Sequence, residues 1–155
     1  MKKSLLFALT LSMVGCTTTK QPTIPTITQA PAITNILYYD VDPVHMGQAT
    51  AVVVGRFAWE DGCIYLVTDD YKRTAMFPKL PENSVSWNET EKVLVLRNAD
   101  DLTKEFEFKM GDGINTNGHR IAYSTALANS FNETDRKCLS KDGIAFVGTF
   151  SIDKY

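Results

Sequence analysis

Two short apolar runs joined by Asp61-Gly62 constrain the fold of this 155-residue chain more than any other feature. Residues 51–59 are rich in β-branched and aromatic side chains, and so is the shorter run 63–67. Such runs favour strands, and Asp-Gly between two of them is a strong signal for a tight hairpin turn. A two-residue turn places apolar residues opposite each other on one face: Trp59 with Ile64, and Phe57 with Leu66. We therefore expect an antiparallel hairpin with that face in the core.

Further strands are expected after this hairpin. Residues 73–77 form a weaker candidate that ends at Pro78, and residues 92–96 form a clearer one. In residues 104–110 apolar side chains alternate with charged ones, as a half-buried strand requires. The last strand is predicted over residues 144–152, where large apolar residues alternate with smaller or polar ones.

Turns and one helix are expected between these strands. Residues 111–113 and 115–118 are rich in Gly, Asn and Asp, which predicts turns. Ser124 is a candidate N-cap for one short helix that extends to residue 129.

Together these segments predict one all-β domain over residues 35–155. We expect a small, mostly antiparallel barrel or sandwich of roughly six to seven strands with at most one short helix, and an OB-like barrel is among the arrangements that fit. The sequence lacks internal repeats and the strand–helix alternation of a nucleotide-binding sheet.

The first sixteen residues have the layout of an export signal. Lys2 and Lys3 precede an apolar run over residues 4–11, and the small residue Gly15 precedes Cys16. A membrane-spanning helix needs about 20 apolar residues, so the short run favours a secretory signal over the alternative of a transmembrane anchor.

Residues 13–16, with the sequence Met-Val-Gly-Cys, resemble the lipobox of bacterial lipoproteins. The resemblance implies that residues 1–15 are a signal peptide, that cleavage leaves Cys16 at the N-terminus, and that Cys16 carries lipid, with palmitate among its acyl chains. Met13 departs from the leucine that is usual at this position. Thr17 is not the aspartate that retains enterobacterial lipoproteins at the inner membrane. The resemblance therefore implies the outer membrane, facing the periplasm or the cell surface.

A tether is predicted between the lipid and the domain. Residues 16–34 are dominated by Thr and Pro and have Lys20 as their one charge. Their prolines favour extended geometry, which would hold the domain up to roughly 50 Å from the membrane. Loss of residues 1–15 removes two lysines and changes the net charge from −2 to −4, which disfavours attraction to nucleic acid or to an anionic membrane surface. We expect no nucleic-acid partner, and attachment to the membrane through the N-terminal lipid.

The three cysteines are an odd number, and lipidation of Cys16 leaves Cys63 and Cys138 as a pair. A pair in an exported protein is most often a disulfide, and this one would close a loop of about 75 residues. Free buried cysteines are the alternative. A metal site is less favoured because the chain has no CxxC and no matched His spacing.

A further set of metal-ligating residue types precedes the first hairpin. Asp40, Asp42 and His45 could supply oxygen and nitrogen ligands, and the D-x-D start resembles that of a calcium loop. The glycine and the terminal glutamate of such a loop are missing, which favours a plain polar connection. We expect no bound metal.

Catalytic candidates are few. His119 could act as a general base only beside a nucleophile, while Ser124 and Ser130 lie in neither a G-x-S-x-G nor an S-x-x-K motif. We therefore expect a protein without enzymatic activity and without a cofactor.

Two surface features are candidate partner contacts. Tyr71, Lys72 and Arg73 follow Asp69-Asp70 at an expected hairpin tip, which is either a docking loop or a solvated turn. Trp87 lies in a polar stretch and is either a surface anchor or part of the core. The aromatic residues that could line a ligand groove or an interface, most of them expected in the core, are Trp59, Trp87, Tyr38, Tyr39, Tyr65, Tyr71 and Tyr123.

These observations predict a lipid-anchored cell-envelope protein that acts as a non-catalytic binding or assembly module for an envelope protein partner. Gly62-Cys63 at the start of a strand, with a second cysteine before a closing strand, resembles small barrels in uncharacterised bacterial envelope proteins. The alternative is a periplasmic inhibitor of a cell-wall hydrolase, similar in plan to the lipoprotein inhibitors of lysozyme, whose motif no stretch of this sequence clearly matches.

Overall fold

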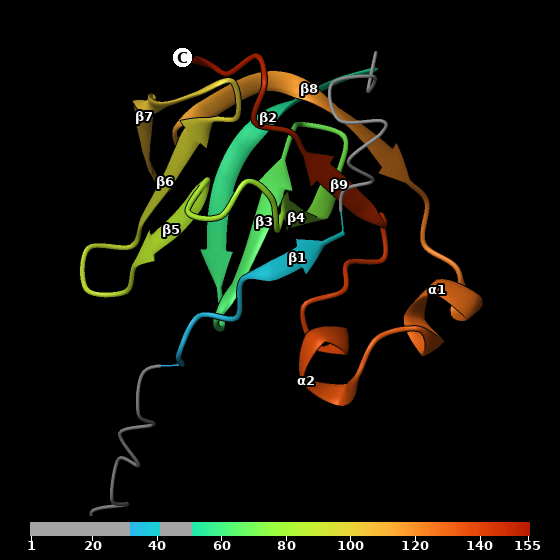
Figure 1. Ribbon diagram of the computed structural model, residues 1–155. Coiled ribbons are helices and arrows are strands. Elements are labelled where there is room, and N and C mark those ends of the chain that lie inside the picture. Colours follow the sequence, from blue (N-terminus) through green and yellow to red (C-terminus); the bar gives the residue numbers. More distant parts are fainter. Residues whose placement is uncertain (1–31, 41–50) are drawn as a thin grey trace, which may run out of the picture. The chain divides into compact units, whose positions relative to one another are not determined.

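The computed structural model describes residues 32–40 and 51–155, which belong to one compact unit (Figure 1). Strands make up most of its secondary structure. The strands are β1 (Leu37–Tyr39), β2 (Ala51–Glu60), β3 (Cys63–Val67), β4 (Lys72–Pro78), β5 (Val85–Asn88), β6 (Val93–Asn98), β7 (Asp101–Lys109), β8 (Gly113–Ile121), β9 (Ile144–Val147) and β10 (Asp153–Lys154). The helices are α1 (Thr125–Asn129) and α2 (Glu133–Arg136). The predicted all-β class is confirmed.

The hairpin around Asp61-Gly62 forms as predicted. β2 and β3 pair antiparallel, with Trp59 opposite Ile64 and Phe57 opposite Leu66. Asp61 and Gly62 have φ angles of 49° and 85°. Positive φ at both central positions is the geometry that matches a two-residue turn to the twist of its strands. The turn residues therefore account for the register of β2 and β3.

Five strands close into a barrel in the order β2, β3, β4, β9 and β8, and β8 pairs back to β2. The pairing of β4 with β9 is parallel, and the other pairings around this ring are antiparallel. β8 is the long curved strand in Figure 1, and its two halves pair with β2 and with β9. A closed five-stranded barrel of this kind is OB-like.

Short strands and a second sheet surround this barrel, so the described residues contain ten strands rather than six to seven. β1 pairs parallel with the end of β4, and β10 pairs with β8. β5, β6 and β7 form a separate antiparallel sheet, which Figure 1 shows beside the barrel. β1 and β10 have three and two residues, too few to produce an alternating pattern in a sequence.

The apolar side chains form two clusters. The first fills the barrel and reaches the three-stranded sheet, and its large members include Phe57, Leu66, Phe77, Leu94 and Phe108. The second lies around Leu37, Cys63, Tyr65, Met76, Cys138 and Ile144. β9 belongs to both, because Ala145 and Val147 are in the first cluster while Ile144 and Phe146 are in the second. A strand covered on both faces is apolar throughout, as residues 144–147 are.

Two of the local predictions are wrong. Residues 115–118 lie within β8 and do not form a turn. A Cβ at Gly118 would lie 2.1 Å from the carbonyl oxygen of Phe146, so this glycine permits the close approach of β8 and β9. The predicted last strand ends at Val147, and the chain then bends before β10.

The helix predicted after Ser124 is confirmed, and a second one follows it. The hydroxyl of Ser124 accepts a hydrogen bond from the N–H of Leu127, as an N-cap does. Asn132 caps α2 in the same way by accepting a hydrogen bond from Asp135. The expectation of at most one helix did not take this second cap into account, because a helix of four residues has no apolar periodicity.

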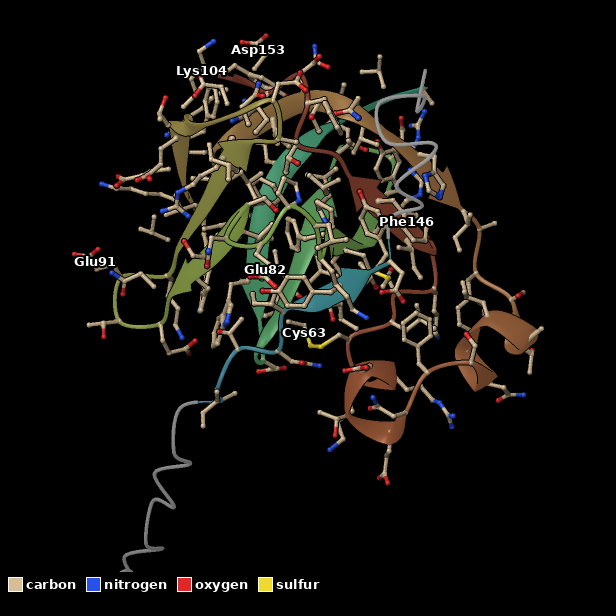
Figure 2. All side chains as sticks on the ribbon, in the orientation of Figure 1. Cys63, Glu82, Glu91, Lys104, Phe146 and Asp153 are labelled. Atoms are coloured by element: carbon tan, nitrogen blue, oxygen red, sulfur yellow. A yellow bond between two sulfur atoms is a disulfide. The ribbon has the colours of Figure 1, made fainter. Side chains whose placement is uncertain are left out.

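Cys63 and Cys138 form the predicted disulfide, with their Cα atoms 5.3 Å apart. Both residues are buried. Figure 2 shows the bond beside Cys63, near α2. The disulfide joins the start of β3 to the segment that leads from α2 into β9.

Candidate functional site

The segment between β8 and β9 covers the outer side of β3 and β4. The disulfide fixes it to β3, and the Thr74 hydroxyl of β4 donates a hydrogen bond to the carbonyl oxygen of Cys138 at 2.6 Å. The same hydroxyl accepts the N–H of Ser140 at 2.7 Å. In OB folds this side of the barrel binds oligonucleotides or oligosaccharides. Here side chains of the protein's own β8–β9 segment occupy it, among them Leu127, Phe131 and Leu139.

Tyr71, Lys72 and Arg73 form a rim at the tip of the β3–β4 hairpin, which we call the cationic rim. The Arg73 guanidinium lies 3.7 Å from the centre of the Tyr71 ring. The Tyr71 hydroxyl donates to the carbonyl oxygen of Val54 at 3.1 Å, which fixes the ring on β2. Lys72 Nζ lies 2.6 Å from the Glu60 carboxylate, and this hydrogen bond raises the pKa of Lys72. The rim is therefore a rigid stack of an aromatic ring and a cation.

Arg73 also retains hydrogen-bonding capacity. Its Nε donates to the carbonyl oxygen of Asp142 at 3.1 Å. One terminal nitrogen, NH1, is buried and has no hydrogen-bond partner within residues 32–40 and 51–155. The preceding Asp69 and Asp70 are exposed, as expected for a hairpin tip.

Trp87 lies in a different part of the structure and is half-buried. It packs against the first apolar cluster, and its indole N–H donates to the Glu89 carboxylate. Lys92 Nζ lies 4.2 Å from the Trp59 ring centre and 6.0 Å from that of Trp87, and it also donates to Glu89. The hydrogen bond from Lys92, with further ones from Thr34 and Trp87, lowers the pKa of Glu89 to about 2. Much of the Trp87 side chain is therefore engaged in contacts within the protein.

This group also holds the start of the described chain. The Trp59 indole N–H donates to the Thr34 hydroxyl at 2.7 Å, and the Thr34 N–H donates to Glu89 at 3.3 Å. The Asn35 N–H donates to the carbonyl oxygen of Gly62 at 2.7 Å. We call Thr34, Trp59, Trp87, Glu89 and Lys92 the clasp. The structure thus places Trp87 in the clasp, whose hydrogen bonds and cation–ring contacts share no residue with those of the cationic rim.

A groove of about 350 Å³, which the sequence did not indicate as a site, lies between β1 and the β4–β5 connection. Tyr38 contributes to its wall and is 41% exposed. Lys79, Glu82 and Asn83 line it from the connection, and Figure 2 labels Glu82. The one signal for the groove in the sequence is Tyr38, an aromatic residue that could line a ligand groove.

His119 and the two serines each make other contacts in the structure. The His119 ring stacks on Phe146, with ring centres 4.1 Å apart. The Ser124 hydroxyl caps α1, and the Ser130 hydroxyl donates to the carbonyl oxygen of Leu127 at 2.6 Å. Both hydroxyls are thus engaged at the ends of α1.

The remaining predicted sites fall mostly outside the described residues. Cys16, the leader over residues 1–15 and the tether as far as residue 31 lie there, as do Asp42 and His45. Asp40 is described, and its carboxylate pairs with Lys79 at 2.8 Å. Within the described part of the chain, no group of His, Cys, Asp or Glu is arranged to hold a metal ion. None of the helices there is long and apolar enough to cross a membrane.

The chain matches no protein-family model, no curated protein and no solved structure.

Proposed function

We propose that this chain is a lipid-anchored protein of the bacterial cell envelope whose barrel acts as a non-catalytic binding or assembly module. The observation that carries the export part of the proposal is the disulfide between Cys63 and Cys138. Disulfides persist in oxidising compartments such as the periplasm and are rare in the cytosol. Export is also what the leader and the lipobox resemblance at Cys16 imply.

Lipid attachment is tested by labelling cells that express the chain with a radioactive or clickable palmitate analogue. We expect label in the wild-type chain and none in Cys16→Ser, with the wild type in the outer-membrane fraction. Cys63→Ser is the matched control, because it removes a cysteine that the disulfide already uses. Equal labelling of Cys16→Ser and the wild type would exclude this anchor.

The cationic rim is the surface that we propose for the envelope protein partner. Arg and Tyr are enriched among the residues that dominate binding energy at protein interfaces. In the rim the Tyr71 ring is fixed by its bond to Val54, and the Arg73 guanidinium stacks on it. Little side-chain freedom is therefore lost on binding. Trp87 is less suited, because its ring packs against the first apolar cluster and its indole N–H is bonded to Glu89.

Crosslinking in intact cells tests this surface. A photo-reactive amino acid at position 71 should capture one envelope protein, identified by mass spectrometry. The same amino acid at position 123 is the control, because Tyr123 is 44% exposed and makes none of the rim contacts. Capture of the same protein in equal yield at both positions would contradict a specific role for the rim.

A second candidate is the inhibitor of a cell-wall hydrolase. Asp69 and Asp70 are exposed at the tip of a two-stranded hairpin, a shape that can enter an enzyme cleft. In a turbidity assay with lysozyme and bacterial cells, an inhibitor would block clearing at a one-to-one ratio. Loss of the block in Asp69→Asn/Asp70→Asn would assign it to this tip, and full clearing in the presence of excess wild-type chain would remove this candidate.

A further inference from the structure

We propose that the groove between β1 and the β4–β5 connection binds a neutral saccharide, such as a segment of an envelope glycan. The inference rests on the proposed function, because it names a ligand class for the binding module. The groove is distinct from the cationic rim, since none of its lining residues takes part in the rim contacts.

The groove has an aromatic platform with apolar walls. Tyr38 is 41% exposed and lies among Pro78, Pro81 and Val85. One face of a sugar ring consists mainly of C–H groups, which pack against the negative face of an aromatic ring. The volume of about 350 Å³ is near the lower end of the range for small-molecule sites, which suits a short saccharide segment.

Polar side chains stand beside this platform. Lys79, Glu82 and Asn83 all line the groove. Lys supplies donors, Glu supplies acceptors and Asn supplies both, whereas each sugar hydroxyl both donates and accepts. A ring of hydroxyls around an apolar face is therefore complementary to this lining.

The charges of the lining favour an uncharged ligand. The Lys79 ammonium is 2.8 Å from the Asp40 carboxylate, so its charge is balanced at close range. Glu82 has no ion pair within the described residues, which leaves the groove slightly negative. A polyanionic ligand would be repelled, while a neutral polyol would not.

A buried polar group without a partner among the described residues lies at the wall of the groove, in Ser84. It lines the groove and is 1% exposed, and its hydroxyl has no hydrogen-bond partner in the described part of the chain. A buried hydroxyl without a partner is unfavourable in the free protein. Because this hydroxyl is itself buried, it is an unsatisfied polar group behind the groove wall, next to the lining that a ligand would contact.

The main alternative occupant is a proline-rich peptide, since prolines and an exposed tyrosine also suit polyproline recognition. Such sites bind through aromatic-lined grooves and do not need several charged or amide side chains beside the ring. Lys79, Glu82 and Asn83 therefore favour the saccharide.

The test is an NMR titration of the full, isotope-labelled chain with the trimer of N-acetylglucosamine. We expect shifts at residue 38 and across residues 78–85, with a Kd of about 1 mM or tighter. Tyr38→Ala should weaken binding at least roughly tenfold, while Tyr38→Phe keeps the ring and should retain affinity. The control is Asn115→Ala, which lies in a separate groove beside β2 and should leave the affinity unchanged.

Two further variants keep the test decisive if Tyr38→Ala does not fold. Glu82→Gln removes an exposed carboxylate, and Asn83→Gly removes a side chain at a position with a φ of 66°, which glycine adopts readily. Each should weaken binding several-fold without loss of structure. No shifts at about 10 mM trimer, or shifts confined to residues outside the groove, would overturn the proposal.

A third arm uses a synthetic peptide with the sequence of residues 20–31, which contains three prolines. Groove shifts with this peptide and none with the trimer would assign the groove to proline-rich chains and overturn the saccharide. None of these outcomes affects palmitate labelling at Cys16 or crosslinking at position 71. Failure of this inference is therefore distinguishable from failure of the proposed function.

Discussion

The indole N–H of Trp59 donates a hydrogen bond to the hydroxyl of Thr34, 2.7 Å away and 25 positions earlier in the chain. The bond fixes the last residue of the predicted tether onto β2. Trp59→Phe keeps an aromatic ring below Lys92 but removes the donor. We expect a loss of stability of about 1 kcal/mol and faster hydrogen exchange of the Thr34 and Asn35 amides. Unchanged exchange of both amides would show that this bond does not hold the segment.

Glu91→Gln is the matched control for this measurement. Glu91 is exposed and bonds to Asn88, outside the clasp. Its substitution should leave the exchange of Thr34 and Asn35 unchanged.

The clasp should also make stability depend on acid. Hydrogen bonds from Lys92, Thr34 and Trp87 hold the pKa of Glu89 at about 2, below its ordinary value of 4.5. The ionised form therefore stabilises the folded state fully above pH 4.5, and this contribution is lost as the pH falls toward 2. Thermal unfolding of the wild type and Glu89→Gln should differ at pH 7 and converge near pH 2. Because the Glu89 side chain is 42% exposed, we expect the difference to shrink in high salt, and a gap that persists at pH 2 would contradict this origin.

The disulfide should make a large contribution to stability. It closes a sequence separation of 75 residues, which corresponds to about 4 kcal/mol on the chain-entropy estimate. Cys63→Ser/Cys138→Ser should lower the Tm by roughly 10–20 °C. The wild type in reductant should unfold near the Tm of the double variant, and the double variant in reductant should not change further. A wild-type Tm that does not respond to reductant under unfolding conditions would contradict this contribution.

The parts of the barrel that could be predicted are those with a strong local signal in the sequence. Asp61-Gly62 predicted the register of β2 and β3 because Asp-Gly favours a two-residue turn with positive φ at both positions, which is the turn observed. Ser124 predicted α1 because capping is a local interaction. The disulfide followed from the cysteine count once Cys16 was assigned to lipid.

Contacts between residues far apart in the sequence could not be predicted from such local signals. The residues around Gly118 predict a turn, although the role of this glycine is to let β8 pass close to Phe146, 28 positions later. The parallel pairing of β4 with β9 leaves no local trace either, because the two strands are far apart in sequence. The groove at Tyr38 was missed for the same reason, since β1 and residues 78–85 meet only in the folded barrel.

The close approach of β8 and β9 at Gly118 can be tested by adding a Cβ there. Gly118→Ala would place a Cβ 2.1 Å from the carbonyl oxygen of Phe146, and because a backbone atom cannot move aside cheaply, we expect a loss of more than about 3 kcal/mol. Gly111→Ala is the control, because it has a φ of 98° but no atom within 4 Å of the added Cβ. This variant should lower the free energy of unfolding only by the cost of a positive φ at alanine, about 1–2 kcal/mol. Urea unfolding that gives equal losses for the two variants would contradict the close-approach explanation.

Ser84 and Thr74 have buried hydroxyls that differ in their hydrogen bonds. Ser84 and Thr74 are each 1% exposed. The Ser84 hydroxyl has no partner within the described residues, whereas that of Thr74 bonds to both Cys138 and Ser140. Ser84→Ala removes an unsatisfied polar group, so it should leave stability unchanged or raise it by up to about 1 kcal/mol.

Thr74→Val keeps the shape of the side chain but leaves the Cys138 carbonyl and the Ser140 N–H without their partner. It should therefore cost about 1–3 kcal/mol. Thr74→Val should be less stable than Ser84→Ala both in urea and on heating. Neither substitution changes the surface exposed on unfolding by more than a few atoms, so the two methods are comparable. A loss in Ser84→Ala as large as that in Thr74→Val would contradict this prediction and would mean that the Ser84 hydroxyl has a partner, such as a buried water.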